Sequence, residues 1–505
     1  MKRRDFLHCV GGAAASSFLM KSLWWPVTAR AMTGQAAGNG KILVVVVLQG
    51  GNDGLNTVVP YTNSDYYQAR PTLAVPANQV LTLDGTTGLH PNLAALMPYW
   101  NAGNLAVIRE VGYPDMSLSH FRGTDIIFSG SSSQQVIPTG WLGRWLESQY
   151  PDFPEVLPVK PMALQQGFSA QLPLQSPDGV TGVVVFDPST FSFLVNSTYT
   201  GGLSDALPAT PGGDELEFIR SVDVSSFQYA NEIEAASNAG TNTVAYPNSN
   251  LGNQLEIVAR LIDGSLDTPV YLTALGGFDT HAGQPGRHPQ LLTDLGNSLA
   301  AFLNDITAMG RADDVTVLTV SEFGRRVGEN GSSGTDHGTA APWLVLGNNV
   351  TGGLYGPAPD LYNLDPYGNL PVANDYRSVY ATLLRGVFGS DPATLNSVLM
   401  GSFPLMGFMS EALAVPDPAV ATRLAPPVQN PVRGAARLSF TLAEPGPVKL
   451  AVYDVRGRQV AVLAEGPRPA GSYEAVWNAR GTARGVYFAR LDAAEARLTQ
   501  KLVVQ

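Results

Sequence analysis

The middle of the chain alternates between short apolar runs and longer stretches with helical periodicity. Residues 41–48 and 315–320 are apolar and rich in β-branched side chains, which is typical of strands buried on both faces of a parallel sheet. Further strands are predicted over 104–111, 269–275 and 343–346. Helices are predicted over 90–100, 119–128, 251–262, 291–306 and 376–388. This order predicts an α/β fold with a mainly parallel sheet sandwiched by helices.

The pattern changes near residue 423. Six short alternating runs follow at close spacing, with turn residues between them, over 437–442, 448–453, 459–463, 472–477, 486–491 and 498–504. Such spacing predicts a small all-β sandwich of the immunoglobulin-like type. We therefore expect an α/β domain over 32–422 and a separate β domain over 423–505. Residues 131–250 have little regular pattern, and we expect them to be a loop-rich insertion beside the site.

The N-terminus has the features of an export signal. Basic residues at 2–4 precede a mildly apolar stretch over 10–25, and a small-x-small motif ends at Ala31. The paired arginines indicate the twin-arginine route, and an amphipathic first helix is the alternative. Cleavage after Ala31 removes Cys9, the single cysteine. No later apolar run reaches the roughly 20 residues of a membrane span, so we expect a periplasmic, cell-surface or secreted protein.

Charge is distributed unevenly along the chain. Residues 1–31 carry +4 and residues 423–505 carry +6, so the total of −11 leaves −21 for residues 32–422. So acidic a domain argues against nucleic acid as a partner, because phosphate backbones require a basic surface. It is compatible with cation binding, although a solvated acidic surface explains the same charge.

Four segments place glycine beside acids or histidines where strands are predicted to end. They cover residues 48–54, 276–283, 321–326 and 335–338. In open α/β sheets, ligands bind beyond the carboxyl ends of the strands. Carboxylate and imidazole groups held there are suitable ligands for a divalent cation.

Six residues of these segments are candidate metal ligands, and each has a structural alternative. Asp53 follows the first strand in a glycine-rich turn, and Asp-Gly turns are common for other reasons. Asp279 and His281 are two residues apart, so both side chains point the same way in an extended segment, although a loop acid and a surface histidine are the alternative. The remaining candidates are Glu322, Asp336 and His337. Glu322 is equally suited to an ion pair with a nearby arginine, and Asp336 to orienting a ligand.

Three further residues are candidate catalytic groups. Ser119 stands at a predicted helix start, where free N–H groups favour a developing anion, although serine also caps helices. His120 follows it directly. Arg325 is suited to clamping an anionic substrate or to pairing with a carboxylate.

Together these motifs resemble the alkaline phosphatase/sulfatase superfamily, and more closely its exported branch named domain of unknown function 1501. The likeness covers about residues 40–400 and depends on Leu48–Tyr61, Ser119–Phe121, Gly277–His281, Ser321–Arg325 and Asp336–Gly338. Residues 430–431, 453–458, 470–471 and 485–488 resemble the sorting domain of type IX secretion cargo, which is related to a flagellar hook-capping domain. A generic immunoglobulin-like stalk is the alternative for this second region.

The resemblance implies an alkaline phosphatase-like fold and assigns roles to matching residues. Asp53, Asp279, His281 and His337 would bind metal, and Ser119 would be the nucleophile. Glu322 stands where the superfamily has an Asp-His pair, so one imidazole is missing unless His120 or Asp336 replaces it. The Cys/Ser-x-Pro-x-Arg motif of sulfatases does not follow the second strand, which favours phosphate over sulfate esters.

The sequence thus predicts an exported metal-dependent hydrolase of small anionic esters, acting through a metal-activated serine. The expected cofactor is one or two divalent ions, zinc first, with manganese, magnesium or calcium as alternatives. The expected partners are the twin-arginine machinery and the type IX machinery. The alternative function is a non-catalytic surface protein that binds a ligand or metal on a degenerate hydrolase core.

Overall fold

The computed structural model of the protein describes two compact units, which divide between residues 412 and 413. The boundary indicated by the sequence lies ten residues later, at 422/423. The described residues are 39–154, 156–167, 172–198, 210, 226–409, 423–424, 431–432, 434–442, 446–468, 471–479, 481–493 and 496–504. The predicted signal peptide and Cys9 lie outside these residues.

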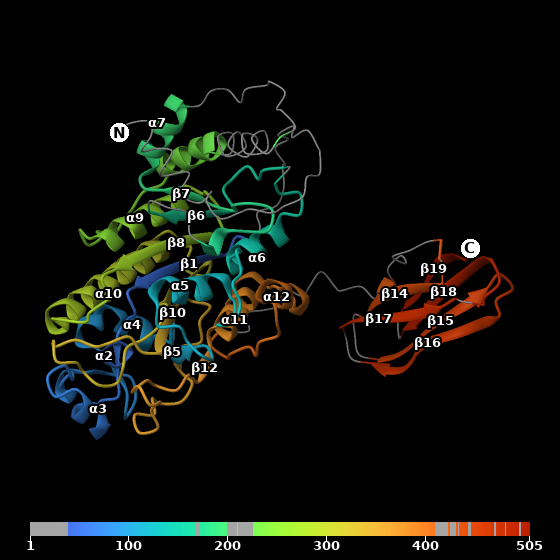
Figure 1. Ribbon diagram of the computed structural model, residues 1–505. Helices are drawn as coiled ribbons and strands as arrows, with labels where there is room; N and C mark the ends of the chain where they lie inside the picture. Colours follow the sequence, from blue (N-terminus) through green and yellow to red (C-terminus); the bar gives the residue numbers. More distant parts are fainter. Residues whose placement is uncertain are drawn as a thin grey trace. The chain divides into compact units, whose positions relative to one another are not determined.

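A nine-stranded sheet organises the first unit (Figure 1). Strand β1 (Ile42–Gln49) lies at its centre and runs parallel to both neighbours, β8 (Val270–Gly276) and β9 (Val315–Val320). Beyond β8, the parallel strands β6 (Ala163–Gln166) and β7 (Val183–Val185) extend the sheet. The strands beyond β9 are, in order, β10 (Ala341–Leu346), β5 (Leu105–Gly112) and β11 (Gly353–Tyr355), with β12 (Asn374–Asp375) also paired to β5. Only β10 among them runs antiparallel to both neighbours, so the sheet is mainly parallel, as the sequence predicts.

Helices cover both faces of this sheet (Figure 1). Alternate residues of β1 point to opposite faces: Leu43, Val45 and Val47 belong to one core, and Val44 and Val46 to the other. The first core includes side chains of α5 (His120–Ser129), α6 (Trp141–Gln149), α11 (Tyr376–Phe388) and α12 (Pro392–Leu399). The second includes side chains of α9 (Asn250–Asp263) and α10 (Gln284–Ala308). Burial on both faces explains the continuous apolar run in β1.

Short elements fill the connections of the first unit. They are α2 (Gly54–Thr57), β2 (Val58–Val59), α3 (Ser64–Ala69), η1 (Ala77–Gln79), β3 (Leu81–Thr82), β4 (Gly88–Leu89), η2 (Pro91–Leu96), α4 (Met97–Asn101), η3 (Leu172–Leu174) and α7 (Pro188–Thr198). The helix expected over 90–100 is thus two elements, η2 and α4. The helix expected over 291–306 begins earlier, at Gln284, so His288 and Pro289 lie inside α10 rather than at its start.

The segment 131–250 is more regular than its sequence indicates. Strands β6 and β7 belong to the main sheet, and α6 packs into the first core. The two strands are four and three residues long, too short for a periodicity to be recognised. The description of this segment as a loop-rich insertion beside the site is therefore corrected for its described part.

The second unit consists of two antiparallel sheets around one core. One sheet contains β13 (Arg423–Leu424), β14 (Ala435–Leu442) and β17 (Gly471–Asn478). The other contains β16 (Gln459–Arg468), β15 (Gly446–Asp454), β18 (Gly485–Ala493) and β19 (Ala496–Val504). Buried residues of both sheets pack together, including Phe440, Leu450 and Leu491. All six strands predicted in this region are confirmed.

None of the helices in the described ranges combines the length and the apolar composition needed to cross a bilayer.

Candidate metal centre

The predicted site residues come from loops that begin at the carboxyl ends of neighbouring strands. Asp279 and His281 follow β8, Glu322 and Arg325 follow β9, and His120 opens α5 beyond the end of β5. Because β1, β8 and β9 are adjacent and parallel, these loops meet at one edge of the sheet. The loop before β10 brings His337 to the same place, because the backbone of His337 forms an isolated antiparallel β-bridge with that of Arg325.

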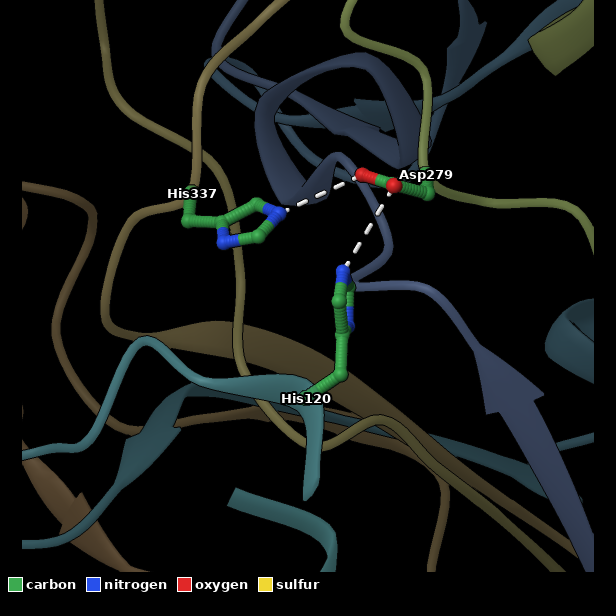
Figure 2. A group of neighbouring side chains, drawn as sticks. All are labelled: His120, Asp279 and His337. Atoms are coloured by element: carbon green, nitrogen blue, oxygen red, sulfur yellow. Dashed lines mark hydrogen bonds and ion pairs between the residues drawn. The ribbon is translucent and has the colours of Figure 1, made fainter. Parts of the chain in front are cut away.

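Four side chains converge there, namely His120, Asp279, His281 and His337, which we call the histidine cluster. The Nε2 atoms of His281 and His337 are each 3.2 Å from Oδ1 of Asp279 and 2.9 Å from each other. Nε2 of His120 lies 3.6 Å from Oδ2 of the same carboxylate. Figure 2 shows His120 and His337 on different sides of Asp279, with their ring nitrogens directed toward it.

The other ring nitrogen of each histidine faces an oxygen acceptor. Nδ1 of His120 lies 2.7 Å from Glu322 Oε1, and Nδ1 of His281 lies 3.1 Å from Asp336 Oδ1. Nδ1 of His337 lies 2.8 Å from the carbonyl oxygen of Leu118. A carbonyl or carboxylate oxygen can only accept, so each Nδ1 carries the proton and donates it. In the neutral rings, all three Nε2 atoms therefore present lone pairs toward Asp279.

This arrangement fits a bound cation. The Nε2 atom of His120 is buried and has no hydrogen-bond partner in the described structure. Two lone-pair nitrogens and a carboxylate oxygen within 3.2 Å of one another cannot all be satisfied without a shared proton or cation. Histidines that donate Nδ1–H to a carboxylate or carbonyl while offering Nε2 are the usual ligands of protein-bound metals. The ligand atoms of His120, Asp279 and His337 all lie within 4.8 Å of one another.

The cluster is open to solvent. Its side chains are between 23% and 48% exposed, whereas a purely structural zinc site is closed by its four protein ligands. Burial raises the pKa of Asp279, but hydrogen bonds and charges from Arg325, His337 and His281 outweigh it and lower the pKa to about 2. Burial lowers the pKa of His337. Near neutral pH, Asp279 is therefore ionised and His337 neutral, as metal ligands must be.

Glu322 contacts the cluster through His120 and is itself held by the protein. Its side chain is 4% exposed. Besides His120, its Oε1 atom accepts from the backbone N–H of Gly50 at 2.9 Å, and Oε2 lies 3.3 Å from the hydroxyl of Ser321. Asp336 has the same relation to His281 and also accepts from Asn330 at 3.1 Å. The structure thus places both carboxylates behind imidazoles.

Arg325 is fully buried and its donors go to the protein. It donates to the backbone carbonyls of Gly50, Gly51, Phe278 and Thr335, and Nη2 lies 2.7 Å from Asp279 Oδ1. These acceptors belong to three of the loops that form the site. Arg325 therefore holds these loops together and fixes Asp279. Of the two roles considered for it, the structure shows the pairing with a carboxylate, and the buried side chain is not exposed to clamp a substrate.

Asp53 lies apart from the imidazoles, in a separate buried ion pair. Nη1 of Arg70 approaches its two carboxylate oxygens at 2.7 and 2.9 Å, and neither side chain is exposed. The Gln284 amide also donates to Asp53. Burial raises the pKa of Asp53, but the charges of Arg70 and His288 and these hydrogen bonds lower it below its ordinary value. The charge of Asp53 is thus balanced by Arg70, which the sequence did not single out.

Ser119 lies between two residues that contact the cluster. The carbonyl of Leu118 binds His337, and His120 is itself a member. Ser119 is the N-cap residue of α5, yet in this described segment its exposed side chain makes no capping hydrogen bond. Its hydroxyl is therefore available at the start of the helix.

Some residues that contact the candidate site residues have weak or no signals in the sequence. Arg70 and Gln284 lie outside the four glycine-containing segments, and a backbone carbonyl such as that of Leu118 leaves no residue-specific signal. His120 was singled out by its neighbour Ser119. By contrast, His90 and His288 are both buried, and their side chains hydrogen-bond with Asn92 and Asn52 rather than with the cluster.

Two family models match the chain. Residues 227–374 match the family described as a protein of unknown function, DUF1501, and residues 429–505 match the secretion system C-terminal sorting domain. Both resemblances seen in the sequence are confirmed. The first match contains Asp279, His281 and His337 but not His120. The second implies export, to the cell surface or into the medium. No curated protein matches the chain.

Several solved structures are similar to this chain at low identity. A protein in the alkaline phosphatase superfamily from Vibrio parahaemolyticus is 11% identical, covers 93% of this chain and 91% of its own, and has a TM-score of 0.34. The PsFucS1 sulfatase from Pseudoalteromonas sp. is 13% identical, with coverages of 87% and 84% and a TM-score of 0.32. A TAB5 alkaline phosphatase mutant with bound Mg is 9% identical, with coverages of 64% and 95% and a TM-score of 0.27. Similarity at this level says nothing about activity.

Proposed function

We propose that the protein is an exported metal-dependent hydrolase whose cation is held by His120, His281, His337 and Asp279. The observation that carries this proposal is the orientation of the three imidazoles. Each donates Nδ1–H to a protein oxygen and directs Nε2 toward the same carboxylate. The mixed nitrogen and oxygen donors favour zinc, with manganese as an alternative. When bound, such an ion polarises a substrate oxygen and lowers the pKa of a nearby hydroxyl or water.

The hydrolysed bond is that of a phosphate ester. Ser119 supplies the nucleophilic hydroxyl, which is exposed beside His120 and makes no capping hydrogen bond in the described helix. The free N–H groups of the first turn of α5 stabilise negative charge that develops there. The sulfatase motif with proline and arginine after the nucleophile is missing from the sequence around Ser119. Phosphate esters are therefore preferred over sulfate esters as substrates.

Export follows from both ends of the chain. The N-terminal arginine pair and small-x-small motif indicate the twin-arginine route, which carries folded, cofactor-loaded proteins. The C-terminal match to a secretion sorting domain supports a second step, through the type IX machinery, to the cell surface or the medium.

A second candidate function is cation binding without turnover. It is favoured by the ion pair between Asp53 and Arg70, because with Asp53 paired in this way the convergent ligands found among the described residues are enough for one ion and not for two. A single ion in an open site is compatible with either function.

Activity separates the two functions. The purified, zinc-loaded protein is incubated with 4-nitrophenyl phosphate, bis(4-nitrophenyl) phosphate and 4-nitrophenyl sulfate. We expect phosphate-ester hydrolysis that EDTA abolishes, and a loss of at least a thousandfold in Ser119→Ala, as for removal of a nucleophile. Ser148→Ala is the matched control, since it also removes one serine hydroxyl, which in α6 donates to the carbonyl of Trp145. Full activity of Ser119→Ala would show that serine is not the nucleophile, and inactivity of the loaded wild type on all esters would favour cation binding alone.

A further inference from the structure

Three arginines belong to the predicted site or its buried ion pair, namely Arg70, Arg325 and Arg326, and the donors of the first two are taken up by the protein. Arg70 donates to Asp53, Asn56 and the carbonyls of Val327 and Arg326. Arg325 donates to four carbonyls and Asp279. Neither side chain is exposed. These two guanidinium groups are committed to the protein and cannot reach a substrate.

Arg326 differs from both. Its side chain is 39% exposed, and its closest charged partner is Asp336, with Nη1 3.9 Å from Oδ2. That separation is beyond hydrogen-bond length. The Nε atom of Arg326 is buried and lacks a hydrogen-bond partner among the described residues. Arg326 is therefore a cation with unused donors on the rim of the cluster.

The position of Arg326 relates it directly to the cluster. Asp336, its weak partner, accepts from Nδ1 of His281 through Oδ1. The backbone N–H of Arg326 donates to the carbonyl oxygen of Asp336 at 3.0 Å. Asp336 is directly followed by His337 in the chain. Arg326 is thus linked to the imidazole of His281 through the Asp336 side chain, and its backbone is bonded to the residue that precedes His337.

Charge decides when Arg326 can attract an anion. Besides the three imidazoles, the ionisable groups in contact at the centre are three carboxylates (Asp279, Glu322, Asp336) and two guanidiniums (Arg325, Arg326), whose charges sum to −1. Asp365 lies within electrostatic range of Arg326 and adds to the repulsion of anions. A divalent cation on the imidazoles raises this balance by two charges, and it attracts the same anion that the guanidinium donors can bind.

We propose that Arg326 forms an anion-binding subsite for a tetrahedral oxyanion, and that this subsite becomes effective only when the histidine cluster holds its cation. The inference rests on the proposed function, because it takes the cation as bound. It narrows the substrates to esters that retain at least one ionised oxygen beside the bond that is cleaved, such as phosphate mono- and diesters. Sulfate esters share this chemistry.

Anion binding tests the subsite without depending on turnover. Inorganic phosphate and inorganic sulfate are titrated separately by calorimetry into the zinc-loaded full chain, into EDTA-stripped protein, and into Arg326→Met, Arg326→Lys and Arg385→Met. Arg385 is an exposed arginine in the last turn of α11, so Arg385→Met removes the same charge from another element of the first unit. Zinc content and thermal unfolding are measured for every variant.

We expect phosphate to bind the loaded wild type and Arg385→Met equally. Arg326→Met should bind about tenfold to a hundredfold more weakly, the range for lost charge-assisted hydrogen bonds, and Arg326→Lys should recover part of this loss. Stripped protein should not bind measurably. Whichever anion depends more strongly on Arg326 identifies the ester class.

Wild-type affinity in a zinc-loaded, folded Arg326→Met variant would overturn the subsite. Equal binding by loaded and stripped protein would overturn its dependence on the cation. The proposed function fails separately: if these affinity changes are found but no ester is hydrolysed, the subsite stands and catalysis does not. If esters are hydrolysed and Arg326→Met changes neither KM nor anion affinity, only the subsite is wrong.

Discussion

Replacing Glu322 with glutamine tests whether the carboxylates behind the imidazoles prepare the cation site. The Oε1 atom of Glu322 accepts from Nδ1 of His120 at 2.7 Å and from the backbone N–H of Gly50 at 2.9 Å. Glutamine keeps the volume and one acceptor oxygen but removes the charge that favours the Nδ1–H tautomer. Loss of such an orienting partner weakens metal affinity by about 10- to 100-fold, which corresponds to about 1.4–2.8 kcal/mol. The variant should stay folded, because the remaining amide oxygen can still accept from Gly50.

The assay is competition for zinc between the protein and a chromophoric chelator. We expect Glu322→Gln to lose affinity within this range and His120→Ala, which lacks the ligand itself, to lose more. Glu147→Gln is the control: Glu147 is on α6, and its Oε2 atom accepts from the backbone N–H of Asp178 at 3.2 Å in an exposed contact. Wild-type affinity of Glu322→Gln together with weakened His120→Ala would refute the orienting role. Wild-type affinity of His120→Ala would remove His120 from the ligand set.

Three other changes test the surroundings of the cluster. Arg325→Met leaves four carbonyls and Asp279 without their donor, and we expect denaturant unfolding to show a loss of about 3–5 kcal/mol; a loss below 1 kcal/mol would contradict this role. Gly50→Ala places Cβ 2.3 Å from the backbone nitrogen of Asp279 at a φ of +117°, so zinc affinity should fall in chelator competition. Gly103→Ala is the control, because Gly103 also has a positive φ but has open space around it. This control should cost only about 1–2 kcal/mol of stability and leave zinc affinity unchanged. Burial lowers the pKa of His288 from the ordinary 6.5 to about 4, so the folded protein keeps this ring neutral at pH values where the unfolded chain protonates it. The contribution of the neutral ring to the free energy of unfolding is therefore complete above pH 6.5 and is lost as the pH falls toward 4. This contribution is about 3 kcal/mol. The free energy of unfolding, measured from pH 7 to pH 4, should therefore depend less on pH in His288→Gln than in the wild type. An unchanged pH dependence in this variant would refute the role of His288.

Much of the fold could be predicted because its signals are local. Strand β1 is apolar at nearly every position, and α9 and α11 have clear helical stripes, so their type followed from periodicity alone. The residue before the α11 stripe is Asp375, a type that commonly caps helices, and its side chain accepts from the N–H of Arg377. Strands β6 and β7 were missed because they are short, and their pairing beside β8 is set by contacts distant in sequence.

The sequence predicts which residues belong to the candidate site better than it predicts the role of each residue there. Strand ends and glycine-rich turns identified the loops that carry Asp279, His281 and His337. The roles depend on which side chain reaches which partner, and this follows only from three-dimensional contacts. Neighbouring arginines 325 and 326 illustrate the point, because one is buried against carbonyls and the other is half exposed. Pairing of Asp53 with Arg70 likewise joins residues with no common motif.

The central claim, a cation held by three imidazoles and one carboxylate, is tested most directly by anomalous diffraction at the zinc edge from crystals of the zinc-loaded protein. The account predicts one peak about 2.0–2.1 Å from the Nε2 atoms of His120, His281 and His337 and within bonding distance of Asp279. A peak beside Asp53, or no peak at the histidine cluster in protein that contains stoichiometric zinc, would contradict it.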